Sequence, residues 1–240
     1  KQISMDYLTG VPNRQELLNM LDLMFKKYPD KEFTLMVVSI RDFRQVNNIC
    51  GQHSGDEFLK SVCRFLCEIG PRENVYRYSG DEFALLFTDG DAERIRRCVG
   101  EIQERLAKPW QNRDYQFILP VAIGIVRRSE YVNTLEKAVS AIEYAVYQAK
   151  TGKYGEVLYC DRSMLGKLER RKQIIQILKD QLAGGDVEMY YQPIYCVDSG
   201  KFMYAESLMR MNNTPIGPVY PSEFIPIAEE TGLIIELTYL

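Results

Sequence analysis

The sequence lacks the features of a membrane-spanning, secreted or nucleic-acid-binding protein. No uninterrupted apolar run reaches about 18 residues, the length that a transmembrane helix needs. No charged segment followed by an apolar core opens the chain, so no signal peptide is expected. The 30 basic and 33 acidic residues give a net charge of −3. Without a polycationic face, nucleic acid is not expected as a partner.

The chain is also poor in side chains of the kind that bind zinc. His53, its only histidine, is interpreted as a solvated loop residue, and its cysteines include no Cys-x-x-Cys pair. Free thiols indicate a reducing cytoplasm. Because the chain begins at Lys1, it is interpreted as a fragment of something longer, with the cytoplasmic part of a membrane-anchored receptor as one alternative. The cysteines are Cys50, Cys63, Cys67, Cys98, Cys160 and Cys196.

Helical and strand patterns alternate over the first two thirds of the chain. The run "FTLMVVSI" at 33–40 is almost continuously apolar, which is typical of a strand buried on both faces. "SGDE" at 54–57 has the pattern of a capping box, so a helix is expected to begin there. The remaining patterns predict helices at 13–28, 91–107 and 134–150, and strands at 117–126 and 156–160. This order predicts an α/β or α+β domain that closes near residue 160.

A second unit is expected from Ser163 onward. It begins with a helix that stops at 184–185, followed by two strand candidates, "VEMYYQPIY" and "KFMYAESLMRM". A proline-rich loop then precedes a helix from about Ser222.

A predicted hairpin at 76–87, "YRYSGDEFALLF", carries two acidic residues at its tip. Asp81 and Glu82 follow Gly80 between two strand-forming runs. One interpretation is that a tight turn needs a glycine and polar neighbours. The other is that the two carboxylates are held rigidly in order to bind a cation.

Several separate stretches resemble known families in their order along the chain. Five stretches resemble GGDEF domains: "DYLTGVPNR" (6–14), "FRQVN" (43–47), "GQHSGD" (51–56), "RYSGDEF" (77–83) and "AVYQAK" (145–150). GGDEF domains are diguanylate cyclases and their degenerate relatives. Those that resemble the opening of an EAL domain, a cyclic-di-GMP phosphodiesterase, are "YYQPIY", "AESLMR" and "PSEFIPIAEETGLI". The first resemblance covers residues 1–162 and the second covers 163–240.

The resemblance implies both a fold and a reaction. The fold is α+β: a palm-type antiparallel sheet with flanking helices, followed by the first elements of an incomplete TIM-type barrel. In the family, each domain binds one GTP and two domains face each other as a homodimer. They form cyclic di-GMP with the help of Mg²⁺, a cation that prefers oxygen ligands.

The metal site is where the sequence departs from the family's pattern. The resemblance makes Asp81 and Glu82 the catalytic acids, with Asp81 and Ile40 at the metal positions. Ser39 stands where a metal-binding aspartate is expected, and Arg41 replaces a second acid. Because side chains alternate along a strand, positions 39 and 41 are expected to share a face. A lost carboxylate and a gained cation both oppose Mg²⁺ binding.

The positions that contact the nucleotide in the family match its pattern better than the metal positions do. The resemblance places Asn47 and Asp56 at the guanine edge, Lys150 at the triphosphate, and Phe43 and Arg44 on a loop whose backbone amides bind phosphates. Two simpler alternatives stay open. Asp56 could serve only the N-terminus of its helix, and Lys150 could be only a cation at a helix C-terminus.

Three further departures concern phosphate and product binding. Ser79 replaces the first glycine of the family's turn, and Tyr154 replaces an arginine that follows Lys150. The family's inhibitory product site falls on residues 70–73, where Gly70 stands in place of an arginine. Product inhibition through that site is therefore not expected.

In the second unit, the resemblance makes Glu206 a metal ligand and places Gln192 and Arg210 at substrate-contacting positions. Arginine suits a pair of phosphate oxygens. The unit is too short to complete a barrel, so no phosphodiesterase activity of its own is expected.

Two functional classes follow. One is a degenerate domain that binds GTP, with cyclic di-GMP as the signal, and regulates an EAL phosphodiesterase behind it. The other is an active diguanylate cyclase that converts two GTP into cyclic di-GMP.

Overall fold

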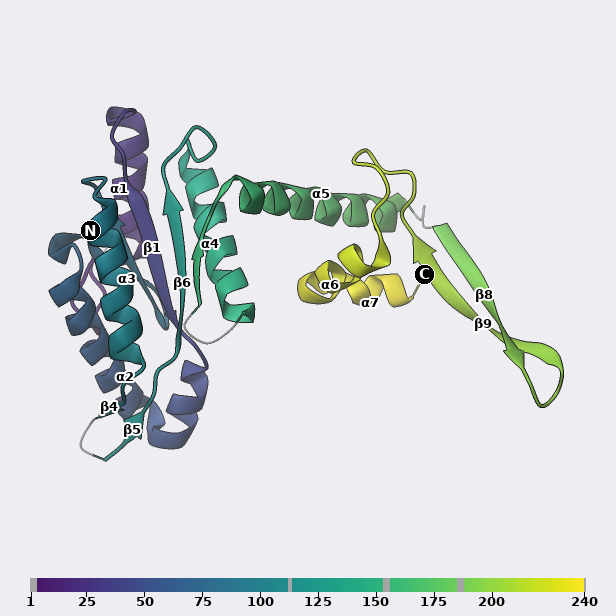
Figure 1. Cartoon of the computed structure of the whole chain (residues 1–240), viewed down its shortest axis with the longest axis horizontal. Helices are drawn as coiled ribbons and strands as arrows, with labels where there is room; N and C mark the ends of the chain where they lie inside the picture. The colour runs from purple at the N-terminus through teal and green to yellow at the C-terminus, as the bar shows by residue number, and fades with distance from the viewer. Residues whose placement is uncertain (1–3, 112–113, 153–155, 185–187, 240) are drawn as a thin grey trace. The chain divides into compact units, whose positions relative to one another are not determined.

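A computed structural model describes residues 4–111, 114–152, 156–184 and 188–239 of the chain. The chain divides into two compact units, Lys1–Leu165 and Gly166–Leu240 (Figure 1). Among the described residues, no helix is long and apolar enough to cross a membrane.

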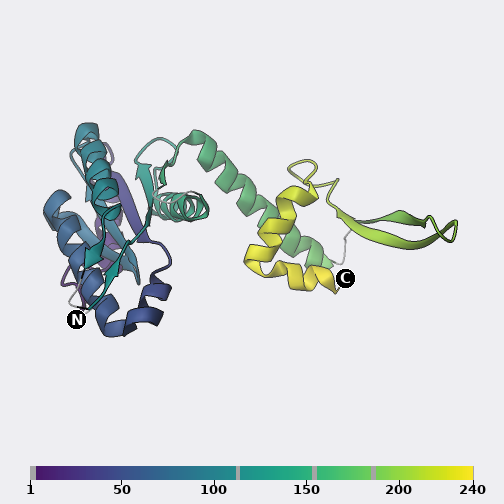
Figure 2. The ribbon, with the colours of Figure 1, turned by 60° about the horizontal axis from the view of Figure 1, so that its bottom comes forward.

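The first unit is built on a five-stranded sheet in the order β2-β3-β1-β6-β7. All neighbours are antiparallel except β6 and β7. The strands are β1 (Thr34–Ile40), β2 (Val75–Ser79), β3 (Glu82–Phe87), β6 (Val121–Arg127) and β7 (Val157–Tyr159). Every residue of β1 is buried, because helices cover both faces of the sheet (Figures 1 and 2). The continuous apolar run in the sequence reflects this double burial.

Each face of the sheet has its own hydrophobic core. Leu35 and Val37 pack with residues of α1 (Arg14–Lys27) and α4 (Leu135–Thr151). Met36 and Val38 pack on the other side with α2 (Phe43–Ile69) and α3 (Ala92–Leu106). Position 39 therefore lies on the α1–α4 face. A short 3-10 helix, η1 (Arg72–Asn74), and a small separate ribbon, β4 (Trp110–Gln111) with β5 (Gln116–Phe117), complete the unit.

Two local expectations from the sequence need correction. The helix expected to begin at 54–57 is the second part of α2, which starts at Phe43 and is interrupted by a kink at Gly51, whose φ of 77° and ψ of 161° are not helical. This conformation is open essentially only to glycine. The strand expected at 117–126 is two strands, β5 and β6, separated at Ile118–Pro120.

The second unit has its own small core and an extended hairpin. Ile174 and Leu178 of α5 (Arg162–Gly184) pack with Phe224 of α6 (Pro221–Thr231). Arg170 on α5 donates two hydrogen bonds to Glu223, at 2.5 and 3.0 Å. The hairpin is β8 (Glu188–Cys196) with β9 (Lys201–Arg210), and α7 (Leu233–Thr238) follows α6. The described residues form no closed barrel. The α+β fold with a central sheet and flanking helices, as expected from the sequence, is confirmed.

Candidate functional site

The β2–β3 turn is held by an arginine that the sequence analysis gave no role. Ser79 pairs with Glu82 in register, leaving Gly80 and Asp81 as the connection. The Arg77 side chain is buried and donates hydrogen bonds to the carbonyls of Ser79 (2.8 Å) and Gly80. Its guanidinium also lies 4.7 Å from the centre of the Phe83 ring. In the sequence, this role could have been inferred from the position of Arg77, a charged residue within a strand whose other residues are mostly apolar or aromatic.

The turn itself does not require a glycine. The φ of Gly80 lies outside the positive range that favours glycine, and a Cβ at this position would meet no atom within 4 Å. The interpretation of Gly80 as a conformational necessity of the turn is therefore wrong. A bare backbone at the tip leaves room for something to approach it closely.

Glu82 is clamped by two donors from this chain. The Lys150 ammonium, in the last turn of α4, donates to Glu82 Oε1 at 2.7 Å, and the Ser79 hydroxyl donates to Oε2 at 2.9 Å. The Glu82 side chain is 14% exposed, whereas Lys150 is 38% exposed. Burial would raise the pKa of Glu82, but these donors and the lysine charge outweigh it and hold the pKa below its ordinary value.

Asp81 behaves differently from its neighbour. Burial raises its pKa, and the adjacent charge of Glu82 raises it further, against the opposing charge of Lys150. The two catalytic acids predicted from the sequence are thus both present at the tip, with pKa values shifted in opposite directions. Glu82 is fixed as a carboxylate by an internal cation, while Asp81 is not.

Ser39 lies directly opposite Glu82 across the β1–β3 ladder. It is completely buried, and its hydroxyl has no hydrogen bond of good geometry in the described part of the chain, although it contributes to the lowered pKa of Glu82. A carboxylate at position 39 would therefore face Glu82. The serine leaves Lys150 as the close charged partner of that acid.

Arg41 lies one residue beyond β1, which ends at Ile40, so strand alternation alone does not fix the side of its side chain. Arg41 donates to the carbonyl of Gly152 at 3.0 Å, at the end of α4, the helix that packs on the face of position 39. Its charge lies at the C-terminus of a helix, where a cation is favourable.

The residues at this tip do not fit a Mg²⁺ ion held by the protein itself. Ile40 and Asp81 are brought together, since the Ile40 amide donates to the Asp81 carbonyl at 3.0 Å. Ile40 can offer a metal only its backbone oxygen, and Glu82 is already engaged by Lys150. Across the described residues, no group of three or more His, Cys, Asp or Glu side chains is placed to hold a metal. Mg²⁺ needs several oxygen ligands in near-octahedral geometry.

The residues that the resemblance places at the guanine edge lie beside the two glycines of "GQHSGD". The kink at Gly51 folds the second part of α2 back, so that the Asn47 side chain packs on Gly55. A Cβ at Gly55 would lie 1.9 Å from Asn47 Oδ1, so no other residue fits there without moving the amide. The next residue is Asp56. The Asn47 amide thus packs against the residue that directly precedes Asp56.

Two electrostatic features mark this part of the site. Asn47 Oδ1 is buried and accepts no hydrogen bond from the described residues. Buried acceptors usually have a partner. The charges of Asp56 and Asp81 both act on Arg77, and they oppose the lowering of its pKa by burial. The Asp56 side of the site and the hairpin tip thus lie around one buried guanidinium.

Phe43 and Arg44 do not lie on a loop, contrary to expectation. They are the first two residues of α2, with Phe43 buried in the core and Arg44 exposed. The helix begins after Asp42, whose φ is 55° and whose side chain does not cap the helix. The backbone amides here therefore belong to a helix N-terminus, which attracts anions.

The position of the family's product-site arginine cannot hold a side chain in this backbone. A Cβ at Gly70 would lie 2.7 Å from the Leu66 carbonyl oxygen and 2.7 Å from a methyl carbon of Leu85. Tyr154, the other departure noted in the sequence, lies outside the described residues.

A second polar cluster next to Lys150 was not foreseen. Arg14 donates to Glu143 at 2.9 Å, and the Tyr78 hydroxyl donates to the same oxygen at 3.1 Å. Burial and the charge of Glu143 raise the pKa of Tyr78 to about 12. Together with Glu82 and Lys150, these residues line a cavity of about 400 Å³ on the α1–α4 face. In the sequence, the only indication of this cluster was Arg14, the arginine of "DYLTGVPNR".

The three EAL-derived positions lie on the β8–β9 hairpin. Gln192 and Glu206 are partners in register across the ladder, and Arg210 pairs in register with Glu188. The Arg210 guanidinium lies 5.8 Å from the centre of the Tyr190 ring. The hairpin therefore brings Gln192 and Glu206 together, as a pair of substrate and metal positions would require, and leaves Arg210 at the end of its strand.

Comparisons with known proteins agree with this architecture. The family described as "Diguanylate cyclase, GGDEF domain" matches residues 3–155, and the EAL domain family matches residues 175–240. The GGDEF domain of DgcB from Caulobacter crescentus, solved in complex with c-di-GMP, superposes with a TM-score of 0.61 at 21% identity. That superposition covers 67% of this chain and 95% of DgcB's solved chain.

Curated relatives are similar over almost the whole chain. The biofilm architecture maintenance protein MbaA of Vibrio cholerae is 31% identical over 95% of this chain. The bifunctional diguanylate cyclase/cyclic di-GMP phosphodiesterase MucR of Pseudomonas aeruginosa is 26% identical over 97% of it. The chain spans 30% of MbaA and 34% of MucR. It therefore belongs to the GGDEF domain family and continues into the first part of an EAL domain.

Proposed function

We propose that residues 1–162 form a module that binds GTP without cyclising it, within a cyclic-di-GMP signalling protein. In this proposal the module regulates an EAL phosphodiesterase that begins in residues 163–240. The observation that carries it is the clamp on Glu82. Glu82, one of the two expected catalytic acids, is held by the chain's own ammonium, at 2.7 Å from Lys150.

The clamp opposes catalysis in two ways. A divalent cation near Glu82 would have to displace Lys150 or share its carboxylate, and like charges at such separations repel strongly in a partly buried site. A second carboxylate would be expected at position 39, but the residue there is Ser39, which is buried and neutral. The family's reaction relies on a metal to neutralise phosphate charge, and these residues do not supply its ligands.

The guanine side supports retained binding. Asn47 offers a buried oxygen without a partner, and Asp56 follows Gly55, against which the Asn47 amide packs. Guanine presents N–H groups on the edge that such an acceptor and a carboxylate recognise. A site with unmet polar groups discriminates strongly, because a base without matching groups leaves them unpaired.

Phosphate contacts in this proposal come from the helix N-terminus at Phe43 and Arg44 and from Lys150. Because Lys150 is engaged with Glu82, phosphate must compete with that carboxylate. We therefore expect weak binding of GTP, with less dependence on Mg²⁺ than in an active cyclase.

The alternative function is an active diguanylate cyclase. Its support is that both acids of the turn are kept and that Ile40 and Asp81 are joined by a backbone hydrogen bond of 3.0 Å. In that case a bound nucleotide would have to draw Lys150 away from Glu82.

A product assay separates the two functions. The chain is fused to a dimerising coiled coil, so that a missing partner does not limit the reaction, and is incubated with GTP and Mg²⁺. We expect no cyclic di-GMP above the level of an Asp81→Asn variant. Mg²⁺-dependent turnover in the wild type that Asp81→Asn abolishes would establish the alternative and refute the proposal.

A further inference from the structure

The first unit contains a second cavity, at the end of the sheet opposite the GGDEF turn. The turn contacts the C-terminal end of β1, where Ile40 bonds to Asp81, whereas this cavity lies at Thr34, where β1 begins. Its volume is about 380 Å³, within the range of small-molecule sites. None of its lining residues belongs to the nucleotide positions.

The cavity lies between α3 and the sheet. Its floor comes from three neighbouring strands: Thr34 of β1, Ile125 of β6 and Tyr159 of β7. Ile125 and Tyr159 are partners in register, so their side chains emerge on the same face. Ala92 and Ile95 of α3 lie across from them. Apart from the hydroxyls of Thr34 and Tyr159, these side chains are apolar.

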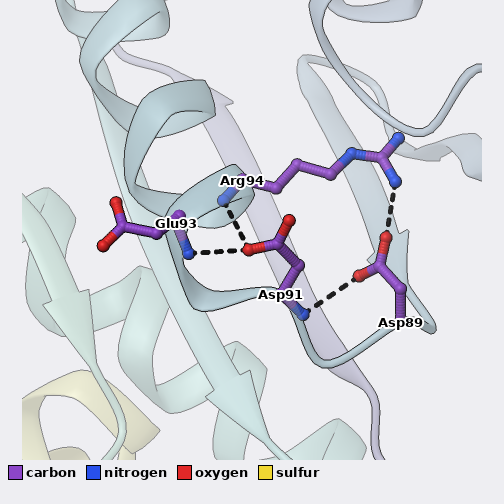
Figure 3. A network of polar contacts seen from close by, with 4 residues as sticks. All are labelled: Asp89, Asp91, Glu93 and Arg94. Carbon is purple, nitrogen blue, oxygen red and sulfur yellow. Dashed lines mark hydrogen bonds and ion pairs between the residues drawn. The ribbon is translucent and has the colours of Figure 1, made fainter.

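One wall of the cavity is fixed by a network of polar contacts at the start of α3 (Figure 3). The Asp91 carboxylate accepts hydrogen bonds from the amides of Glu93 (3.0 Å) and Arg94 (3.1 Å). Asp89 accepts from the Asp91 amide at 3.2 Å and pairs with Arg94 at 2.6 Å. Gly90 and Ala92, which line the cavity, alternate with these residues. The wall is thus preformed rather than left to a free loop.

Two arginines stand at the lining of this apolar space. Arg127 is the register partner of Thr34 on β6, and Arg96 follows Ile95 on α3. Arg127 pairs with Glu32 at 2.6 Å, and Arg96 pairs with Glu93. Both pairs are solvent-exposed on both sides, with side-chain exposures between 57% and 82%. Exposed ion pairs of this kind contribute little to the stability of the fold. Another anion can therefore replace either glutamate at a small cost in free energy.

We propose that this cavity is a binding site for a small amphipathic anion, with an apolar body between Ile95, Ile125 and Tyr159 and a carboxylate paired with Arg96 or Arg127. The apolar floor supplies the area that a ligand buries. The guanidinium supplies a bidentate, charge-assisted partner. Cys160 also lines the cavity. Burial raises its pKa to about 11, so it adds a neutral thiol rather than a second negative charge.

The test uses 4-phenylbutyrate as the probe and 4-phenylbutanol as its uncharged control, titrated into the ¹⁵N-labelled full chain. We expect saturable amide shifts that centre on Ala92, Ile95, Ile125 and Tyr159, with the acid binding about tenfold more tightly than the alcohol. The result overturns the proposal if no shift saturates by about 10 mM, a range where even weak fragments bind. Shifts centred on the β8–β9 hairpin, or equal binding of acid and alcohol, also overturn it.

Variants attribute the binding to these residues. Arg127→Gln and Arg96→Gln together should weaken the acid about tenfold and leave the alcohol unchanged, because only the charge is lost. Arg97→Gln, an exposed arginine on the same helix outside the lining, should change neither. Ala92→Leu should weaken both ligands by filling the space. An unchanged affinity of the acid in the double arginine variant would refute the proposal, whatever the GTP titration of the nucleotide site shows.

Discussion

The β2–β3 and β8–β9 hairpins have similar compositions and opposite environments. Both combine tyrosines and aliphatic residues with acids. In β2–β3, Tyr76 is 2% exposed, whereas Tyr204 in β9 is 72% exposed. The cause is the neighbouring strand: β3 pairs with β1 on its second edge and helices cover both faces, while among the described residues β8 and β9 pair only with each other.

This difference decides how firmly each hairpin holds its functional side chains. Glu82 is held by Lys150 from α4 and by Ser79 from its own turn. Gln192 and Glu206 face each other only by register across a two-stranded ladder. A two-stranded hairpin is marginally stable alone, because three or more strands or a packed helix are needed for independent stability. The first hairpin is therefore a defined site, and the second presents its residues without a surrounding shell.

The largest expected difference concerns hydrogen exchange. Amides of β1 and β3 should exchange at least about a thousandfold more slowly than those of β8 and β9, because the five-stranded core opens only with its whole unit. Peptide-resolved exchange of the full chain, followed by mass spectrometry, measures this directly. Equal protection of the two hairpins would show that β8–β9 is covered by something other than the described residues.

Core substitution should show the same contrast. Leu86→Ala removes a fully buried side chain from β3 and should lower the free energy of unfolding by about 3 kcal/mol. Tyr204→Ala should change it by less than about 0.5 kcal/mol, as surface changes usually do. The chain's single tryptophan, Trp110, is buried in the first unit and reports its unfolding in urea. A similar cost for both changes would contradict the comparison.

Removing the internal cation tests the clamp. Lys150→Met should cost about 1–2 kcal/mol, less than a fully buried pair because the lysine is 38% exposed. The pair lowers the pKa of Glu82, so its contribution is present above the ordinary glutamate pKa of about 4.3 and is lost as the pH falls through the lower, folded-state pKa. The cost should therefore be full at pH 7 and shrink in acid.

The matched control for the clamp is Lys108→Met. Lys108 also donates to a glutamate, Glu104, at 2.7 Å, but both side chains are more than 60% exposed. This variant should unfold like the wild type. A cost that does not depend on pH for Lys150→Met, or an equal cost for both variants, would mean that Lys150 acts through packing alone.

A small net change in stability is expected for Gly55→Ala. The gain of about 0.5–1 kcal/mol from replacing a helical glycine by alanine should be offset by the crowding of the buried Asn47 amide. The new Cβ would also displace the Asn47 amide, which lies 1.9 Å from its position, so GTP binding should weaken. Gly100→Ala, in an open position on α3, should stabilise without affecting GTP. Unweakened GTP binding in the Gly55 variant would exclude Asn47 from the site.

Much of the central sheet and the family resemblance were readable from the sequence. Buried strands such as β1 leave a continuous apolar run because both faces are covered, and ordered motifs carried the family resemblance. Both signals lie within short stretches of the chain, and for this reason a single sequence is enough to detect them.

The features that could not be predicted from the sequence depend on backbone conformation or on contacts between residues far apart in the chain. The kink in α2 depends on Gly51, whose φ is 77°, three residues before the place where the sequence pattern indicated a helix start. The contact of Arg41 with the carbonyl of Gly152 joins residues that are 111 positions apart in the chain. The clamp joins Lys150 to a glutamate 68 residues earlier, so no spacing rule could have shown it.

In the proposed function, the first unit recognises guanine without needing a metal. Calorimetric titration of GTP and ATP, each in Mg²⁺ and in EDTA, tests it on the wild type and on Asp56→Ala. We predict weak binding of GTP that prefers guanine by at least about tenfold, changes little on removing Mg²⁺, and is lost in Asp56→Ala. Equal binding of GTP and ATP, or GTP binding that vanishes in EDTA, would contradict the claim.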